Sequence, residues 1–161
     1  MARGPSLKLR EGDPAPDFSA KVSGGSRVSL GDFKGRHVVL YFYPRDNTPG
    51  CTAEACAFRD RFADFQKEEV VILGVSTDTV ASHDRFAARY QLPFPLLADE
   101  DRAIVKAYGV WGEKQFMGRT YDGTFRATFL IRPDGRIKKI WPTVQPARHA
   151  KEVLKAVTSD E

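Results

Sequence analysis

The hydrophobic pattern of the chain alternates short apolar runs with longer amphipathic segments. Residues 37–43 (HVVLYFY) and 70–76 (VVILGVS) are nearly continuous β-branched and aromatic runs, which is typical of strands buried on both faces of a sheet. From 51 to 67, three phenylalanines recur at spacings of four and three and predict one helix with an apolar stripe. The pattern therefore predicts a strand–helix–strand unit.

The remaining segments complete an α/β pattern. We expect a hairpin at 18–22 and 27–30, helices at 80–90, 101–108 and 147–157, an extended piece at 94–97, a loop at 109–123, and strands at 126–131 and 136–141. The last two strands are joined by residues 132–135 (RPDG), in which Pro presets one backbone dihedral and Gly permits a positive one. This order predicts a mixed central sheet flanked by helices, with an N-terminal β-hairpin.

Composition and charge are those of a globular protein with one core. We expect a flexible N-terminal arm at 1–11, broken by Gly and Pro, and a single domain at 12–161. No apolar run approaches the ~20 residues that cross a bilayer, and the N-terminus lacks a signal-peptide core, so we expect a cytoplasmic protein with no membrane partner. The net charge of +4 arises from basic residues interleaved with acidic ones, which argues against a nucleic-acid partner.

The two cysteines, Cys51 and Cys56, carry the chemical information. Cys51 comes soon after a buried strand and stands in the first turn of the expected helix, a position where ligands bind in open α/β sheets. Free N–H groups and the helix dipole stabilise a thiolate there. Thr48 can donate its hydroxyl to the sulfur or to a bound oxygen, and Pro44 stiffens the loop. The alternative is that Cys51 is a small buried hydrophobe.

This segment resembles a known family. The pattern Pro44-x-x-x-Thr48-x-x-Cys51 is the signature of peroxiredoxins, and the string YFYPRDNTPGCTAEACAFRD is similar to the subgroup called peroxiredoxin Q or bacterioferritin comigratory protein. The resemblance extends from about residue 12 to residue 157 and includes 108–114 (YGVWGEK) and 126–131 (RATFLI). It implies a thioredoxin-like fold and a thiol-dependent peroxidase that needs no cofactor.

The resemblance also implies roles for individual residues. Cys51 would be the peroxidatic cysteine, Thr48 would hydrogen-bond the peroxide, and Pro44 would shield the site. Arg126 matches the active-site arginine of the family, whose guanidinium stabilises negative charge as the O–O bond breaks. The other interpretation of Arg126 is a surface residue at a strand end. Glu54 lies one helical turn past Cys51, where it either orients Arg126 or is an exposed carboxylate.

Cys56 matches the resolving cysteine of those family members that have one in this helix. Five residues along an α-helix separate two Cα atoms by ~8.6 Å, whereas a disulfide needs them within roughly 7 Å. A Cys51–Cys56 bond therefore requires the first turns of the helix to unwind. The resemblance implies a sulfenic acid on Cys51, reduction of the disulfide by thioredoxin or a similar dithiol, and a monomer. The alternative is that Cys56 packs in the helix only for its volume.

Two other classes of function deserve comparison. A thiol–disulfide oxidoreductase of the same fold typically uses Cys-x-x-Cys, and the longer gap, Thr48 and Arg126 argue against it. A non-catalytic module that binds a metal or nucleic acid would need ligand spacing, which His37, His83 and His149 lack. We expect these histidines at helix caps or on the surface, and no metal.

Overall fold

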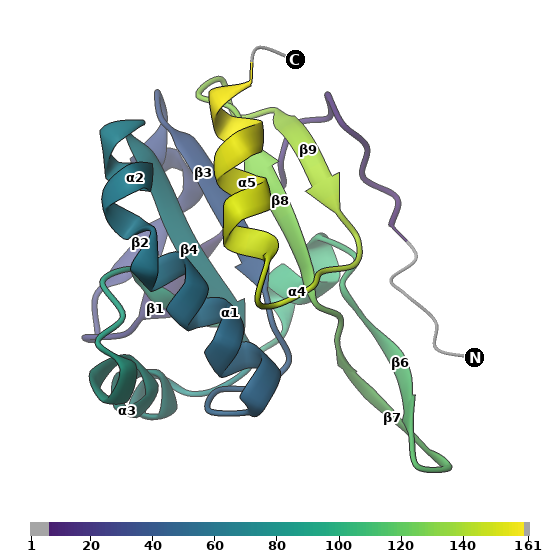
Figure 1. The fold of residues 1–161 in the computed structure, drawn as a ribbon. Helices are drawn as coiled ribbons and strands as arrows, with labels where there is room; N and C mark the ends of the chain where they lie inside the picture. Colours follow the sequence, from purple (N-terminus) through teal and green to yellow (C-terminus); the bar gives the residue numbers. More distant parts are fainter. Residues whose placement is uncertain (1–6, 160–161) are drawn as a thin grey trace.

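A mixed seven-stranded sheet forms the centre of the described part of the chain, residues 7–159 of the computed structural model, in the order β2-β1-β5-β4-β3-β8-β9 (Figure 1). The two apolar runs form strands β3 and β4, which pair in parallel at the middle of the sheet. Strands β4 and β5 are also parallel, and all other neighbouring strands of this sheet are antiparallel. The strands are β1 (Ser19–Val22), β2 (Arg27–Ser29), β3 (His37–Phe42), β4 (Val70–Ser76), β5 (Leu96–Ala98), β8 (Ala127–Ile131) and β9 (Ile137–Trp141). The predicted fold class and the N-terminal hairpin are confirmed.

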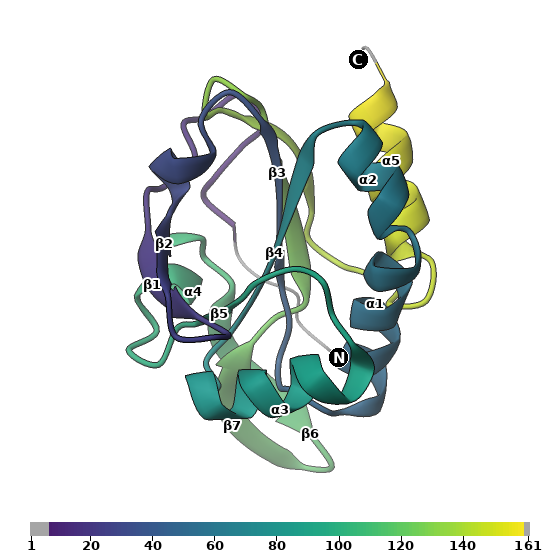
Figure 2. The ribbon, with the colours of Figure 1, turned by 90° about the vertical axis from the view of Figure 1, so that its left-hand side faces the viewer.

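Helices cover both faces of this sheet, as Figure 2 shows. Successive side chains of a strand point to opposite faces. Val39 and Tyr41 of β3 therefore pack with the helices at 49–60, 62–67 and 149–158, while Leu40 and Phe42 pack with the helix at 103–107 and with β1. The helical segments are η1 (Leu30–Phe33), α1 (Pro49–Asp60), α2 (Phe62–Lys67), α3 (Val80–Tyr90), α4 (Ala103–Ala107) and α5 (His149–Thr158). Among the described residues, none of these helices has the length and apolar character that a membrane span requires.

The helix expected at 51–67 is two helices. The backbone N–H of Arg61 bonds the carbonyl of Phe58, three residues back, at 3.2 Å, and such a tightened turn ends an α-helix. Arg61 itself leaves helical geometry, with φ −108° and ψ 10°. The repeat of phenylalanines continues across this break, which is why the periodicity did not reveal it.

The loop predicted at 109–123 is wrong for most of its length, because these residues form a second β-hairpin. Strands β6 (Trp111–Phe116) and β7 (Arg119–Thr124) pair in antiparallel fashion and extend away from the main sheet (Figure 1). Met117 and Gly118 both have positive φ, 51° and 78°, as a tight two-residue hairpin turn of type I′ requires. Most side chains of these strands are at least partly exposed, so no buried alternation marked them in the sequence.

The N-terminal segment follows the body of the protein over the part that is described. Residues 1–6 of the expected arm lie outside the described residues. Leu7 and Leu9 pack against the core cluster that contains Phe42. Gly12 and Asp13 then exchange backbone hydrogen bonds with Ile137 at the start of β9.

The expectation that His83 and His149 lie at helix caps or on the surface is wrong. Both are fully buried, because both ring nitrogens of each find a polar neighbour. His149 Nε2 lies 2.7 Å from Thr128 Oγ1, and Nδ1 lies 3.4 Å from Glu152 Oε1. Burial lowers the pKa of His149 to about 4, so this ring is neutral at pH 7.

Gly74, in the middle of β4, offers a test of the central packing. A Cβ at this position would lie 2.8 Å from Leu96 Cδ2 and 2.9 Å from the Tyr41 hydroxyl oxygen. We expect Gly74→Ala to lower the free energy of unfolding by about 1–3 kcal/mol, the usual cost of overpacking. Urea denaturation measures it, with Gly31→Ala as the control because nothing lies within 4 Å of a Cβ there. Equal stabilities of the two variants would contradict the packing described here.

Candidate active site

Cys51 lies at the start of α1, directly beyond the carboxyl end of β3. Thr48 is the N-cap residue in an extended conformation and Pro49 occupies the first helical position, where its missing N–H costs nothing. The side chain of Cys51 is buried, with 1% of its surface exposed. No side chain among the described residues caps the first turn, so its N–H groups remain available to a bound oxygen.

Sheet register brings Arg126 to this position. Ala127, the first residue of β8, pairs with Phe42, the last residue of β3, so Arg126 stands beside the start of α1. Its Nη2 atom lies 3.2 Å from the Cys51 sulfur. Gly50 permits this approach, since a Cβ on it would lie 3.1 Å from the same nitrogen.

Glu54 holds the other side of the Arg126 guanidinium. Arg126 Nη1 donates to Glu54 Oε1 at 2.7 Å, and the Glu54 side chain is fully buried. Of the two interpretations offered by the sequence, the exposed carboxylate is therefore wrong. Burial raises the pKa of Glu54 to about 7, against the opposing effect of Arg126. Burial alone would lower the pKa of Arg126, but Glu54 and Cys51 raise it above its ordinary value, so the guanidinium is charged.

Thr48 and Pro44 flank the cysteine on the loop that joins β3 to α1. The Thr48 hydroxyl donates to the carbonyl oxygen of Arg45 at 2.9 Å, so its hydrogen points at the loop. The sequence had led us to expect donation to the sulfur or to a bound oxygen, which this geometry does not show. An oxygen lone pair of Thr48 is left to accept a hydrogen bond. Pro44 is half-buried directly after Tyr43.

Cys56 lies in the same helix as Cys51. Both residues belong to α1, both are free thiols, and Cys56 is partly buried while Cys51 is buried. The intact helix keeps the two Cα atoms beyond the separation that a disulfide spans. This arrangement is a reduced, folded form.

Lys114 is a further cation at this site that the sequence analysis did not single out. It is half-buried on β6, and its Nζ donates to the carbonyl oxygen of Thr124 at 2.9 Å. Burial and the charge of Arg126 lower the pKa of Lys114, whereas Cys51 raises it. Lys114 is the last residue of the string 108–114, which carried part of the family resemblance. That position in the string was the sequence feature that could have marked Lys114 as a site residue.

Asp46, Asp78 and His83 form a second polar cluster, in which one ligand-type atom of each lies within 4.8 Å of the others. Asp46 Oδ2 already faces the Ser82 hydroxyl at 2.8 Å and His83 Nδ1 at 2.7 Å. Asp78 Oδ2 accepts from the Ser76 hydroxyl at 2.6 Å. A cation would have to displace these donors, so we assign a hydrogen-bond network and no metal to this cluster.

Comparison with known proteins agrees with the geometry. Residues 11–140 match the model of the AhpC/TSA family. The peroxiredoxin Bcp of Escherichia coli is 46% identical over 146 residues, which cover 91% of this chain and 94% of that protein. The peroxiredoxin Bcp of Bacillus subtilis is 44% identical over 151 residues, covering 94% of this chain and 96% of the relative.

Solved structures give the same answer. The structure of Xanthomonas campestris peroxiredoxin Q superposes with a TM-score of 0.86 at 39% identity, covering 96% of this chain and 98% of the other. Cys51 at a helix start, in contact with an arginine held by a buried glutamate, stands within that shared fold. On the family match, the sequence identity and the fold together, the chain belongs to the AhpC/TSA family and is a peroxiredoxin, a thiol-dependent peroxidase.

Proposed function

We propose that Cys51 is the peroxidatic cysteine. Its thiolate attacks the terminal oxygen of a hydroperoxide, the O–O bond breaks, the alkoxide or hydroxide leaves and takes up a proton, and Cys51 becomes a sulfenic acid. The observation that carries this proposal is the 3.2 Å contact between the sulfur and Arg126 Nη2. A fixed guanidinium stabilises both the thiolate and the charge that develops on the leaving oxygen.

Glu54, Thr48 and Pro44 support this reaction in different ways. Glu54 positions Arg126 through the 2.7 Å ion pair. Thr48 donates to the carbonyl of Arg45 and accepts a hydrogen bond from the terminal hydroxyl of the hydroperoxide. Pro44 covers the loop side and limits access of water to the sulfur.

Cys56 resolves the sulfenic acid in the same chain. After the first turns of α1 unwind, the Cys56 thiolate attacks the Cys51 sulfur, the S–S bond forms, and the hydroxyl group leaves as water after protonation. Both cysteines belong to one helix, so no second subunit is needed, and we propose a monomer.

The remaining partners follow from this cycle. Thioredoxin or a similar dithiol reduces the disulfide, and a reducing cytoplasm is the compartment where such reductants act. The bacterioferritin comigratory protein of Xanthomonas campestris, whose structure is similar to this chain, has alkyl peroxide reduction activity. We therefore propose organic hydroperoxides as substrates in addition to hydrogen peroxide.

Intact mass measured within seconds of adding one equivalent of hydrogen peroxide to reduced protein tests the two cysteine roles. We expect the loss of two hydrogens, and peptide mapping that links Cys51 to Cys56. In Cys56→Ser the expected product is instead one oxygen heavier at Cys51. A wild-type product one oxygen heavier at Cys51, with no disulfide, would remove Cys56 from its role, and an unchanged mass of the wild type would remove both cysteines.

Arg126→Lys tests the double contact of the guanidinium. A single ammonium group cannot contact Glu54 and Cys51 together in the same geometry, so we expect kcat/KM for hydrogen peroxide to fall about 100- to 1,000-fold. Peroxide consumption with a dithiol reductant measures it, and Arg119→Lys, at an exposed position of β7, is the matched control. Equal losses in the two variants would contradict the proposed role.

The pH dependence of stability tests the environment of Glu54. Its pKa in the folded protein is about 7, above the ordinary value of 4.5, so the stability that its proton confers is present below pH 4.5 and is lost as pH rises through 7. Relative to Glu54→Gln, we expect the free energy of unfolding of the wild type to fall by on the order of 3 kcal/mol over this interval. Urea denaturation at several pH values measures the difference, and parallel curves would show that Glu54 is ionised throughout.

A further inference from the structure

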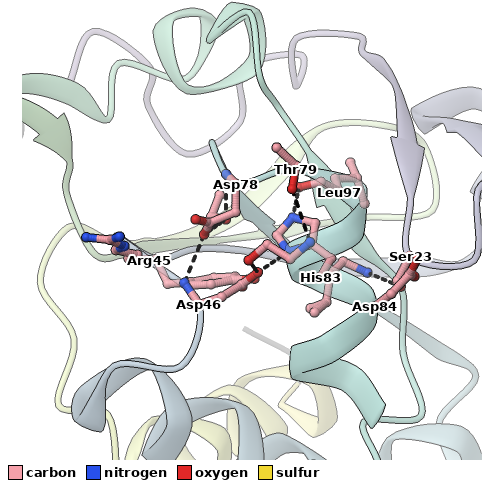
Figure 3. A network of polar contacts seen from close by, with 12 residues as sticks. Ser23, Arg45, Asp46, Asp78, Thr79, His83, Asp84 and Leu97 are labelled. Atoms are coloured by element: carbon pink, nitrogen blue, oxygen red, sulfur yellow. Dashed lines mark hydrogen bonds and ion pairs between the residues drawn. The ribbon is translucent and has the colours of Figure 1, made fainter. Parts of the chain in front are cut away.

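The loop between β3 and α1 is held to the rest of the protein chiefly at one residue, Asp46 (Figure 3). The Asp46 side chain is 4% exposed. Its Oδ1 atom accepts from the Tyr43 hydroxyl at 2.6 Å, and its Oδ2 atom faces the Ser82 hydroxyl at 2.8 Å and His83 Nδ1 at 2.7 Å. The backbone N–H of Asp46 donates to Asp78 Oδ2 at 2.8 Å. Side chain and main chain of this one loop residue are therefore both fixed.

His83 connects this loop to the sheet. The ring is fully buried on α3, and its Nε2 atom lies 2.9 Å from the carbonyl oxygen of Leu97 on β5. A carbonyl oxygen only accepts, so Nε2 carries a hydrogen, and Nδ1 faces the Asp46 carboxyl group at 2.7 Å. The imidazole thus bridges the loop and strand β5.

The tether ends shortly before the reactive cysteine. Cys51 comes five residues after Asp46. Asn47 is held more weakly, with its Oδ1 atom 3.4 Å from both Arg89 Nη1 and the Tyr90 hydroxyl of α3. Beyond it, the first turn of α1 has no side-chain cap among the described residues. The contacts of Asp46 are therefore the last short side-chain hydrogen bonds that hold the loop to the rest of the protein before Cys51.

We propose that Asp46 and His83 are positioning residues that hold the start of α1, and with it Cys51, in the folded arrangement that reacts with peroxide. This proposal rests on the proposed roles of Cys51 and Cys56. It assigns a role in the reaction to two residues that do not contact the Cys51 sulfur. Asp46 and His83 set the balance between the folded helix and its unwound form, because each contact to Asp46 exists only while the loop is in place.

Two competing fates of the Cys51 sulfenic acid make this balance measurable. Attack by Cys56 requires the helix to unwind, whereas a second peroxide oxidises the sulfenic acid to a sulfinic acid in the folded site. Loosening the loop should therefore slow the first reaction with peroxide and at the same time reduce overoxidation. Both quantities are therefore expected to fall, and a control variant that loses global stability without loosening the loop separates this effect from general destabilisation.

His83→Ala tests the proposal in the full-length protein. We expect kcat/KM for hydrogen peroxide to fall about tenfold, as the loss of one buried hydrogen-bond partner implies, and the overoxidised fraction of Cys51 after turnover in excess peroxide to fall several-fold. Stopped-flow kinetics and intact mass measure the two effects. Should this variant not fold, Ser82→Ala removes one contact to Asp46, and we expect the same two changes at smaller size.

Asp46→Asn is the conservative counterpart. Its amide oxygen accepts from Tyr43, and its NH2 group donates to Nδ1 of a neutral His83 whose Nε2 hydrogen still bonds Leu97, while the Ser82 hydroxyl, which donates to Asp46 Oδ2 in the wild type, turns to accept the second amide hydrogen. We expect kcat/KM and overoxidation close to those of the wild type. Ala88→Gly, at an exposed position of the same helix, lowers stability without touching the loop and is the matched control.

The outcomes distinguish failure of the positioning role from failure of the proposed peroxidase function. Wild-type kcat/KM and overoxidation in His83→Ala or Ser82→Ala, or the same changes in Ala88→Gly at equal loss of stability, would overturn the positioning role. Failure of peroxide to oxidise Cys51 in the wild-type protein would overturn the proposed function itself, whatever the loop variants do. A fall in kcat/KM together with less overoxidation in His83→Ala, with neither change in Asp46→Asn, would support the positioning role.

Discussion

A single guanidinium, that of Arg126, is the interaction on which the site depends. It contacts the Cys51 sulfur at 3.2 Å and the Glu54 carboxylate at 2.7 Å, and Glu54 is fully buried. A buried carboxylate without a cation carries a large desolvation cost. Arg126 offsets that cost and in return is held at the sulfur. The small residue before the cysteine, Gly50, leaves the space for this contact.

In the proposed cycle, α1 is stable enough to place Cys51 and weak enough at its start to release it. α1 begins at Pro49 without a side-chain cap among the described residues, and it ends at a tightened turn before Arg61. Its last turn is anchored through Phe58, which packs against Tyr41 and Phe65. Local stability therefore rises from the first turn towards the last turn of the helix, which is the gradient that unwinding from the cysteine end requires.

Local signals in the sequence predicted most of the regular structure. The two apolar runs became β3 and β4, and the RPDG turn joins β8 to β9. The hairpin β6–β7 was not predicted, because most of its side chains are at least partly exposed and its turn is Met117-Gly118, so neither alternation nor a usual turn pair marked it. The break at Arg61 was not predicted, because it depends on one backbone hydrogen bond and leaves the phenylalanine spacing intact.

The sequence by itself determined the class of fold, the position of Cys51 at a helix start and the need for that helix to unwind before Cys56 can reach it, because periodicity, turn chemistry and helix geometry are local properties. Only the tertiary structure decided which distant residues meet. Arg126 lies 75 positions from Cys51, and His83 lies 37 positions from Asp46. The antiparallel register of β3 with β8 brings the first pair together, and the packing of α3 against β5 and the loop brings the second. Burial then determined that Glu54 is a partner of Arg126 and that two histidines belong to the interior, since only the folded chain removes these groups from water.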